Sequence, residues 1–290
     1  MPRCLAVVVS IAACALGECR AQLPPTVETI SFAVARAFER GAAVAGELRI
    51  PRSGDARLPA VVIVNSSPGF DGRGASYAAA LNEASIATLE IDVMHGRGMP
   101  ASHRDHMPHA YQSLEYLARH PRIDPARIGI MGFSWGGMVT LAAASESLTR
   151  EHTGGKLRFA SHLGVYPICW RQAAVLAGKD RHLKPAVFAQ VTGAPVHILA
   201  AENDDFDPPG SCAGFIAALP AAARRHFSLT IFPGATFGWD SVSGSATYSA
   251  GAHGNKGGIV TIVADERIAE RSREFAVEYF ATTLAPDQKR

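Results

Sequence analysis

The sequence carries almost no excess of either charge. Its 290 residues include 28 Lys and Arg against 26 Asp and Glu, a formal net charge of +2. No segment concentrates the basic residues into a stripe, which is what a nucleic-acid-binding surface requires. We therefore expect no nucleic-acid partner.

The chain also lacks internal repeats, low-complexity tracts and long linkers. Nearly half of its residues, 48%, are hydrophobic, which is enough for a sizeable core. Its length fits one large α/β domain or two small ones. Because nothing divides the chain, we expect one domain over residues 22–290.

No hydrophobic run near the N-terminus is long enough to cross a bilayer. A basic residue precedes a short apolar run over residues 5–13, and small residues follow, which is the pattern of a secretory signal peptide at residues 1–21. Cleavage after Ala21 would place Cys19 and Ala21 at the −3 and −1 positions. A lipoprotein signal with Cys14 as the lipidated residue is one alternative, and a buried N-terminal helix is another. We expect export to a bacterial periplasm without a membrane span, by plain secretion or with a lipid anchor at Cys14.

Cysteine is scarce in the expected mature chain. Three of the five cysteines lie within residues 1–21, so only Cys169 and Cys212 remain after cleavage. An oxidising compartment favours a disulfide between them, and two buried free thiols are the alternative.

Short apolar runs alternate with amphipathic segments along the rest of the chain. Strands and helices that alternate at this spacing predict an α/β fold, with a mainly parallel central sheet covered by helices on both faces. The run at 60–64 is continuously apolar, as in a strand buried on both faces. The expected strands cover residues 30–38 and 43–50 at an edge (the first of these is also compatible with a helix), and 60–64, 86–91, 127–131, 162–166, 195–200 and 227–232. The expected helices cover residues 75–84, 108–119, 138–144 and 265–284.

The most informative motif is Gly-Phe-Ser-Trp-Gly at residues 132–136. It fits the G-x-S-x-G nucleophile elbow, in which a strand turns sharply into a helix and exposes one serine. An expected strand at 127–131 precedes it and an alanine-rich helix follows it, as the motif requires. Ser134 is therefore the candidate nucleophile.

A serine nucleophile needs a histidine to take its proton and a carboxylate to orient that histidine. In the α/β-hydrolase order both follow the serine on later loops at the carboxyl ends of strands. Asp204 lies a few residues past the strand at 195–200 and is the candidate acid, with Asp205 as the alternative. Only His226 and His253 come later in the chain, and His226 opens a strand at the opposite end of the sheet. Elimination leaves His253 as the candidate base, although an ordinary surface histidine fits the same position.

The oxyanion hole needs two backbone N–H groups. Trp135, which follows the nucleophile, is expected to supply one. The loop after the strand at 60–64 is expected to supply the other, from Ser67 or else from Ser66, because Pro68 has no N–H. A simple Ser/Pro/Gly turn is the alternative interpretation of this loop.

Two further groups of residues are candidate ligands. His103, His106 and His109 recur every three residues, but no carboxylate or cysteine completes a metal-binding set, so we expect no metal and no organic cofactor. His95 and Arg97 follow an expected strand and face the site, either as substrate contacts or as parts of a structural loop.

Over residues 60–284 the chain resembles the dienelactone hydrolase family of the α/β-hydrolase superfamily. The resemblance rests on Arg-Gly at 97–98, Asp-Pro-Ala-Arg-Ile-Gly at 124–129, Asp-Asp-Phe-Asp-Pro at 204–208 and Phe-Pro-Gly-Ala at 232–235. It implies an α/β-hydrolase fold and a small-molecule ester or lactone as substrate. Ser134 and Asp204 match the family's catalytic motifs.

The chain departs from the family pattern at two positions. The namesake enzymes use a cysteine nucleophile where this chain has Ser134, which implies an ester hydrolase of the group. The family's histidine normally follows the Pro-Gly-Ala in the pattern P-G-A-x-H, and Phe237 stands at that position. The resemblance also implies a Cys169–Cys212 disulfide, because one exported branch pairs a Tyr-Pro-x-Cys with a cysteine past the acid loop.

The sequence thus predicts an exported serine esterase of Ser-His-Asp type, built on Ser134, His253 and Asp204. The alternative is a catalytically impaired binding protein that keeps the fold, which Phe237 motivates. The sequence does not indicate the oligomeric state.

Overall fold

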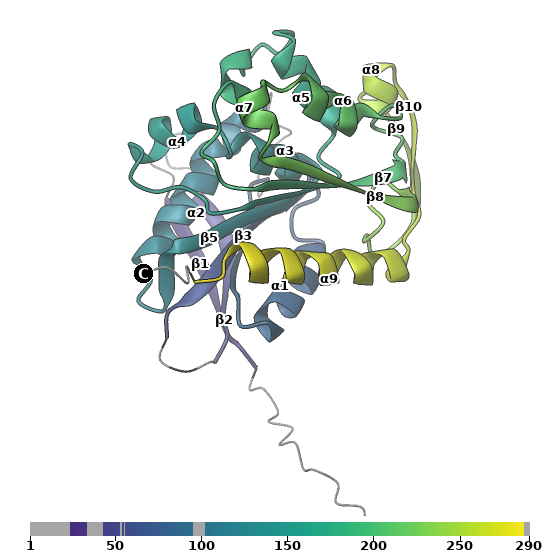
Figure 1. The fold of residues 1–290 in the computed structure, drawn as a ribbon. Helices are drawn as coiled ribbons and strands as arrows, with labels where there is room; N and C mark the ends of the chain where they lie inside the picture. The colour runs from purple at the N-terminus through teal and green to yellow at the C-terminus, as the bar shows by residue number, and fades with distance from the viewer. Residues whose placement is uncertain (1–23, 34–42, 53, 55, 95–101, 287–290) are drawn as a thin grey trace, which may run out of the picture.

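An eight-stranded mixed sheet runs through the centre of the molecule (Figure 1). The structure is a computed structural model that describes residues 24–33, 43–52, 54, 56–94 and 102–286. The strand order is β1-β2-β4-β3-β5-β6-β7-β8. β1 pairs antiparallel with β2, and β2 pairs antiparallel with β4. The six strands from β4 to β8 in this order are parallel to one another. The strands are β1 (Thr26–Ala33), β2 (Ala43–Ile50), β3 (Leu58–Val64), β4 (Ala87–Asp92), β5 (Ile123–Phe133), β6 (His162–Val165), β7 (Val196–Asn203) and β8 (Phe227–Thr236).

Helices cover both faces of this sheet, so the predicted α/β-hydrolase architecture is confirmed. Helices α1 and α9 pack together on one face, whereas α2 and α3 lie against the other (Figure 1). The helices are α1 (Arg73–Glu83), α2 (Met107–Arg119), α3 (Trp135–Ala142), α4 (Glu146–Thr153), α5 (Cys169–Leu176), α6 (Ser211–Ala218), α7 (Ala221–Arg224), α8 (Ala252–Asn255) and α9 (Glu266–Thr283), with 3-10 turns η1 (His103–His106) and η2 (Pro185–Phe188). None of the helices described here is long and apolar enough to cross a membrane.

The centre of the core is the apolar run that the sequence analysis placed in a strand. Every residue from Ala60 to Val64 in β3 is fully buried, because helices cover both faces of the sheet there. Behind β5, the ring of Phe280 in α9 leaves no room for a side chain at Gly129, where a Cβ would lie 2.7 Å from that ring. Gly129 thus allows α9 to pack closely against the elbow strand.

The N-terminal strands differ in one respect from the expectation of two edge strands. β2 lies inside the sheet between β1 and β4, so the two edges are β1 and β8. β1 runs from Thr26 to Ala33, and the rest of the expected strand at 30–38 falls outside the described residues, as does the expected signal peptide.

A second, two-stranded sheet was not anticipated. β9 (Ser245–Ser249) and β10 (Gly258–Ile262) form an antiparallel hairpin with α8 between them, within a segment that the sequence analysis treated as a long loop. The pairing sets Thr247 opposite Val260 and Ala246 opposite Thr261. Since side chains alternate between faces, the first pair and the second point to opposite sides of the hairpin.

Candidate active site

Ser134 lies at a strained turn between β5 and α3. β5 ends at Phe133 and α3 begins at Trp135, and Ser134 between them has φ 52° and ψ −110°. Few non-glycine residues adopt a positive φ, and those that do cluster at active sites. Two backbone hydrogen bonds hold the turn: Ser134 N–H donates to the Val165 carbonyl at 2.9 Å, and Met138 N–H donates to the Ser134 carbonyl at 3.0 Å.

The glycines of the elbow are required by close backbone contacts. A Cβ on Gly132 would lie 2.4 Å from the Gly136 carbonyl oxygen, and a Cβ on Gly136 would lie 2.1 Å from the Val64 carbonyl oxygen. No side chain fits at either position without moving the backbone, so strand and helix meet at this angle only when both residues are glycine.

Ser134 opens onto a cavity of about 270 Å³. Its floor comes from the elbow and from the loop after β3, one wall is aromatic, and the β9–β10 hairpin forms the roof. The lining residues are Ser66, Ser67, Pro68, Arg73, Ser134, Phe206, Phe237, Ser245, Thr247, Tyr248, Ser249, Val260 and Ile262. Ser134 and the loop expected to hold the oxyanion therefore share one cavity.

The two N–H groups expected to bind the oxyanion belong to Trp135, which follows Ser134, and to Ser67 in the cavity wall. Trp135 is the first residue of α3, and the first N–H groups of a helix have no partner within the helix. Ser67 lines the cavity from the loop that runs from β3 to α1, and the Gly69 N–H closes that loop by donating to the Ser66 carbonyl at 3.0 Å.

Arg73 places a buried cation at the edge of the cavity. It is the first residue of α1 and is ion-paired with Asp71, which accepts from Nε and from Nη2. Nη2 also donates to the Ser66 hydroxyl at 2.9 Å, and Nη1 donates to the Tyr166 hydroxyl at 3.1 Å. The guanidinium thus connects α1, the loop after β3 and the end of β6.

A buried carboxylate, Asp240, completes this network. It accepts from the Tyr166 hydroxyl and, at 3.0 Å, from the Tyr77 hydroxyl, and it lies 4.0 Å from Arg73 Nη1. Burial raises the pKa of Asp240, whereas Arg73 and the two tyrosines favour its ionised form. The sequence alone does not predict that Arg73, Tyr166 and Asp240 form one network, because no local motif connects positions so far apart in the chain.

Phe237 stands where the family pattern places histidine, and its ring is part of the cavity wall. The ring centroid lies 4.5 Å from that of Phe206 and 5.0 Å from that of Tyr166, and the side chain is only 6% exposed. The wall that faces Ser134 from this side is therefore apolar.

Asp204 lies on the loop after β7 with its carboxylate turned into that loop. Oδ1 accepts from the Phe206 and Asp207 amides at 2.7 and 3.2 Å. Burial, and then the neighbouring Asp207 carboxylate, raise the pKa of Asp204 to about 8. Asp204 lines an adjacent cavity with Asp207, not the cavity that contains Ser134.

His253 lies beside the acid loop through its backbone, and its side chain is exposed. Its N–H donates to the Asp205 carbonyl at 2.7 Å, and the Gly254 N–H donates to the Phe206 carbonyl at 3.1 Å. His253 has φ 50°, and its ring is directed toward Gly258. No hydrogen bond within the described part of the chain joins this ring to Asp204 or to Ser134.

The three histidines considered as metal ligands pack beside the elbow helix. Trp135 Nε1 donates to His106 Nδ1 at 2.8 Å, and the His106 and His109 rings meet edge to face. Burial lowers the pKa of His103 to about 4, which keeps its imidazole neutral. His95 and Arg97 lie outside the described residues.

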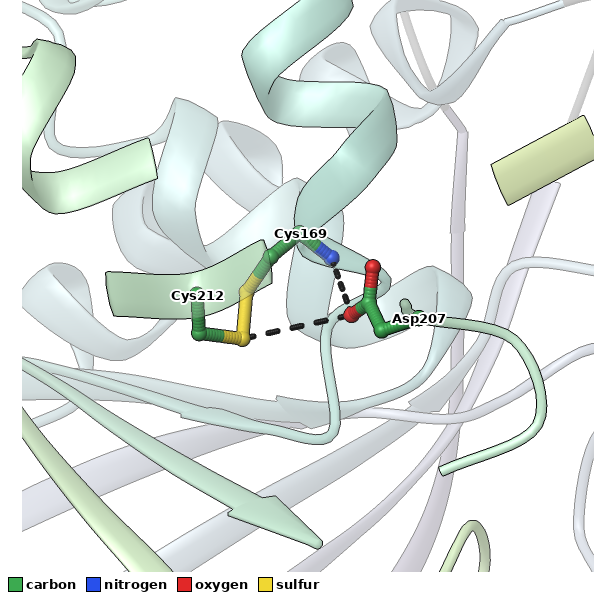
Figure 2. A group of neighbouring side chains, drawn as sticks. All are labelled: Cys169, Asp207 and Cys212. Carbon is green, nitrogen blue, oxygen red and sulfur yellow. Dashed lines mark hydrogen bonds between the residues drawn. A yellow bond between two sulfur atoms is a disulfide. The ribbon is translucent and has the colours of Figure 1, made fainter. Parts of the chain in front are cut away.

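Cys169 and Cys212 lie beside the acid loop (Figure 2). Their sulfur atoms are 1.98 Å apart, as in a disulfide, which would tie α5 to α6. Asp207 accepts from the Cys169 and Trp170 amides at 2.6 and 2.8 Å. Its negative charge there also interacts favourably with the positive end of the α5 dipole. Potential metal-ligand atoms of Cys169, Asp207 and Cys212 lie within 4.8 Å of one another, but sulfurs at disulfide distance would bond to each other and leave no free thiolate.

The model of the dienelactone hydrolase family matches residues 77–284. The chain belongs to the dienelactone hydrolase family. It is thus a hydrolase that acts on ester bonds. No curated protein sequence matches it.

Solved structures of esterases share the fold at low sequence identity. Esterase 2 of Thermogutta terrifontis is 15% identical with a TM-score of 0.65, and covers 89% of this chain and 96% of its own. Est1E of Butyrivibrio proteoclasticus is 17% identical with a TM-score of 0.57, over 87% of this chain and 99% of its own. A dienelactone hydrolase of Anabaena variabilis is also 17% identical, with a TM-score of 0.59, and covers 89% of this chain and 98% of its own.

Proposed function

We propose that the protein cleaves a carboxylic ester or lactone in two steps, with Ser134 as the nucleophile. Ser134 Oγ attacks the carbonyl carbon, the carbonyl π electrons move onto oxygen, and the hydroxyl proton passes to a base. The tetrahedral intermediate then re-forms the carbonyl and expels the alcohol, which takes the proton from the base. Water repeats both steps on the acyl-enzyme and releases the carboxylic acid.

The observation that carries this proposal is the position of Ser134. The residue has a positive φ at the strand-to-helix turn and lines a cavity together with Ser67. The N–H groups of Trp135 and Ser67 are proposed to bind the oxyanion that forms on the substrate.

We assign the base to His253 and the orienting carboxylate to Asp204. The hydrogen bond from His253 N–H to Asp205 attaches the histidine segment to the acid loop, which supports this pairing. An imidazolium beside Asp204 would lower the raised pKa of that carboxyl and favour its ionised form. The ring must turn toward Asp204 when substrate binds, and catalytic hydrogen bonds often tighten only in the complex. Loss of the base in His253→Ala should lower kcat by about 10²- to 10⁴-fold; full activity would show that the assignment is wrong.

A second candidate function is supported by Phe237. With a phenyl ring in the cavity wall where the family has its base, the chain would bind esters without turning them over efficiently. Such a protein would retain the fold and the pocket, and would release product slowly or not at all.

Labelling with a fluorophosphonate separates the two functions. Attack of Ser134 Oγ on phosphorus expels fluoride and leaves a stable phosphonyl-serine, so labelling reports an activated serine. The wild-type protein should label and Ser134→Ala should not. A wild type that resists the probe, or a Ser134→Ala variant that labels equally, would exclude the esterase. The solved structure of Thermogutta terrifontis esterase 2 is phosphorylated by paraoxon, which makes this probe class a reasonable choice.

The substrate is proposed to be a small ester with an apolar or aromatic part. Phe206, Phe237, Val260 and Ile262 offer apolar surface to the ligand. Est1E, a structural neighbour, has been solved with ferulic acid bound. A small aromatic ester is therefore the first substrate to assay.

Export and the disulfide are part of the same proposal. Cleavage after Ala21 would deliver the chain to a compartment in which Cys169 and Cys212 oxidise. The mass of the mature chain distinguishes removal of residues 1–21 from lipidation at Cys14. Alkylation without reductant should leave the mass of the mature chain unchanged. A mass increase that corresponds to alkylation of both Cys169 and Cys212 would exclude the disulfide.

A further inference from the structure

We propose that the Ser66 hydroxyl is a third oxyanion donor, and that Arg73 positions it. The proposal rests on the esterase function proposed above and adds a side-chain group to the two backbone amides. No proton is transferred in this role: the Ser66 O–H donates a hydrogen bond to the oxygen of the tetrahedral intermediate.

The direction of one hydrogen bond carries the argument. Arg73 Nη2 lies 2.9 Å from Ser66 Oγ, and a guanidinium has no acceptor, so Ser66 must accept here. The Ser66 proton is therefore left to be donated elsewhere, and none of the residues that the structure describes accepts it. Ser66 is only 3% exposed, and buried hydroxyls normally have partners for their protons. A substrate oxygen in the cavity would be such a partner.

The position of Ser66 suits this role. Ser66 lines the same cavity as Ser134 and immediately precedes Ser67, whose amide is a proposed oxyanion donor. A hydroxyl that accepts from a cation is polarised and becomes a stronger donor. Substrate would thus meet an amide and a hydroxyl from adjacent residues of one loop.

Arg73 does not need Ser66 to balance its charge. Asp71 pairs with its Nε and Nη2, Tyr166 accepts from Nη1, and Asp240 lies 4.0 Å away. These partners fix the guanidinium from three sides, so that the remaining Nη2 hydrogen bond fixes the Ser66 side chain. Arg73 acts through Ser66 and is a positioning residue.

The test compares Ser66→Ala with Ser76→Ala, the same truncation at an exposed serine of α1 outside the cavity. The assay substrate is 4-nitrophenyl acetate, whose leaving group departs as an anion, so acylation does not depend on protonation of the alcohol. We expect Ser66→Ala to lower kcat by about 10²-fold with little change in KM, as for loss of one oxyanion donor. Ser76→Ala should stay within about twofold of wild type, because Ser76 is exposed and does not line the cavity.

Two further measurements separate catalysis from structure. A trifluoromethyl ketone, which forms a tetrahedral adduct with serine, should bind Ser66→Ala more weakly by about the factor lost in kcat/KM. The Arg73→Lys substitution should lower kcat in the wild-type background and have little further effect in Ser66→Ala, since the two residues act as a unit.

The outcomes distinguish this inference from the proposed function. If wild-type Ser134 reacts with ester and fluorophosphonate but Ser66→Ala matches wild type, Ser66 is not a donor and the inference fails alone. A Ser66→Ala variant whose KM rises while kcat holds would assign Ser66 to ground-state binding and also overturn the inference. If wild-type Ser134 does not react with either reagent, the esterase function and the inference both fail.

Discussion

At the scale of single residues, catalytic competence depends on which group takes the proton of Ser134. Phe237 contributes only a ring to the cavity wall, and the His253 ring is exposed at the acid loop. The Asp204 carboxylate meanwhile accepts from two amides of its own loop. Local backbone geometry thus positions the proposed nucleophile, whereas its proposed base comes from a segment about 120 residues further along the chain.

Phe237→His should increase esterase activity. An imidazole at this position would share the cavity with Ser134, and a positioned general base contributes about 10²- to 10⁴-fold. We expect kcat/KM for 4-nitrophenyl acetate to rise at least tenfold, with a new inflection near the pKa of histidine. Phe237→Leu is the control, and equal activity of the two variants would contradict the prediction.

Asp204 should make the stability of the protein depend on pH. Its pKa is about 8 in the folded state, against an ordinary value of about 3.9 in the unfolded chain. Between these values the folded state holds a proton that the unfolded state releases, so the free energy of unfolding falls as the pH rises from about 4 to 8. Urea unfolding measures this free energy at pH 5 and at pH 8. Between the two pH values it should fall by about 1–3 kcal/mol less for Asp204→Asn than for wild type. Parallel behaviour of the two proteins would refute this.

At the scale of elements, the local patterns of the sequence were sufficient for the sheet but not for the roof of the cavity. β3 was predicted because its apolar run is continuous and buried on both faces. β9 and β10 have only five residues each, are largely exposed and lie among glycines, so neither shows a clear alternation. The elbow could be predicted because its geometry depends on glycines that belong to the motif itself.

The hairpin roof should control access of substrate to Ser134. Thr247 lines the cavity, whereas Thr261 is on the opposite face of the paired strand. Thr247→Trp should raise KM about tenfold or more, because the larger side chain occupies space that the substrate needs. The same substitution at Thr261 should leave KM within about twofold, since an exposed position seldom matters. Equal KM values for the two variants would show that the hairpin does not form the roof in solution.

At the scale of the whole molecule, Asp240 joins segments that lie far apart in the chain. It contacts Tyr77 of α1, Tyr166 at the end of β6 and the guanidinium of Arg73, and the Tyr77 hydroxyl also meets Ser272 of α9 at 2.6 Å. Such a network could not be predicted from sequence, because each member is unremarkable in its local context. The candidate nucleophile, by comparison, depends on five consecutive residues.

Loss of Asp240 should be costly for the folded state. Asp240→Ala would leave Arg73 with an incomplete set of anionic partners and the buried Tyr166 hydroxyl without its acceptor, while Tyr77 would keep only Ser272. Removing one partner of a buried charge network typically costs about 3–5 kcal/mol. Asp124→Ala removes a carboxylate from a partly exposed pair with Arg127 and should cost less than about 1 kcal/mol. Urea unfolding measures both, and similar losses would mean that burial of Asp240 contributes little.

The backbone hydrogen bonds between the acid loop and the hairpin segment have a mechanical consequence. His253 and Gly254 donate to the carbonyls of Asp205 and Phe206, and Thr261 N–H donates to the Asp205 carboxylate at 2.8 Å. As long as these hydrogen bonds hold, movement of the hairpin pulls on the loop that carries Asp204. Amide hydrogen exchange at 253, 254 and 261 should therefore slow together when an inhibitor fills the cavity. Closure over the substrate and adjustment of the acid would then be a single motion.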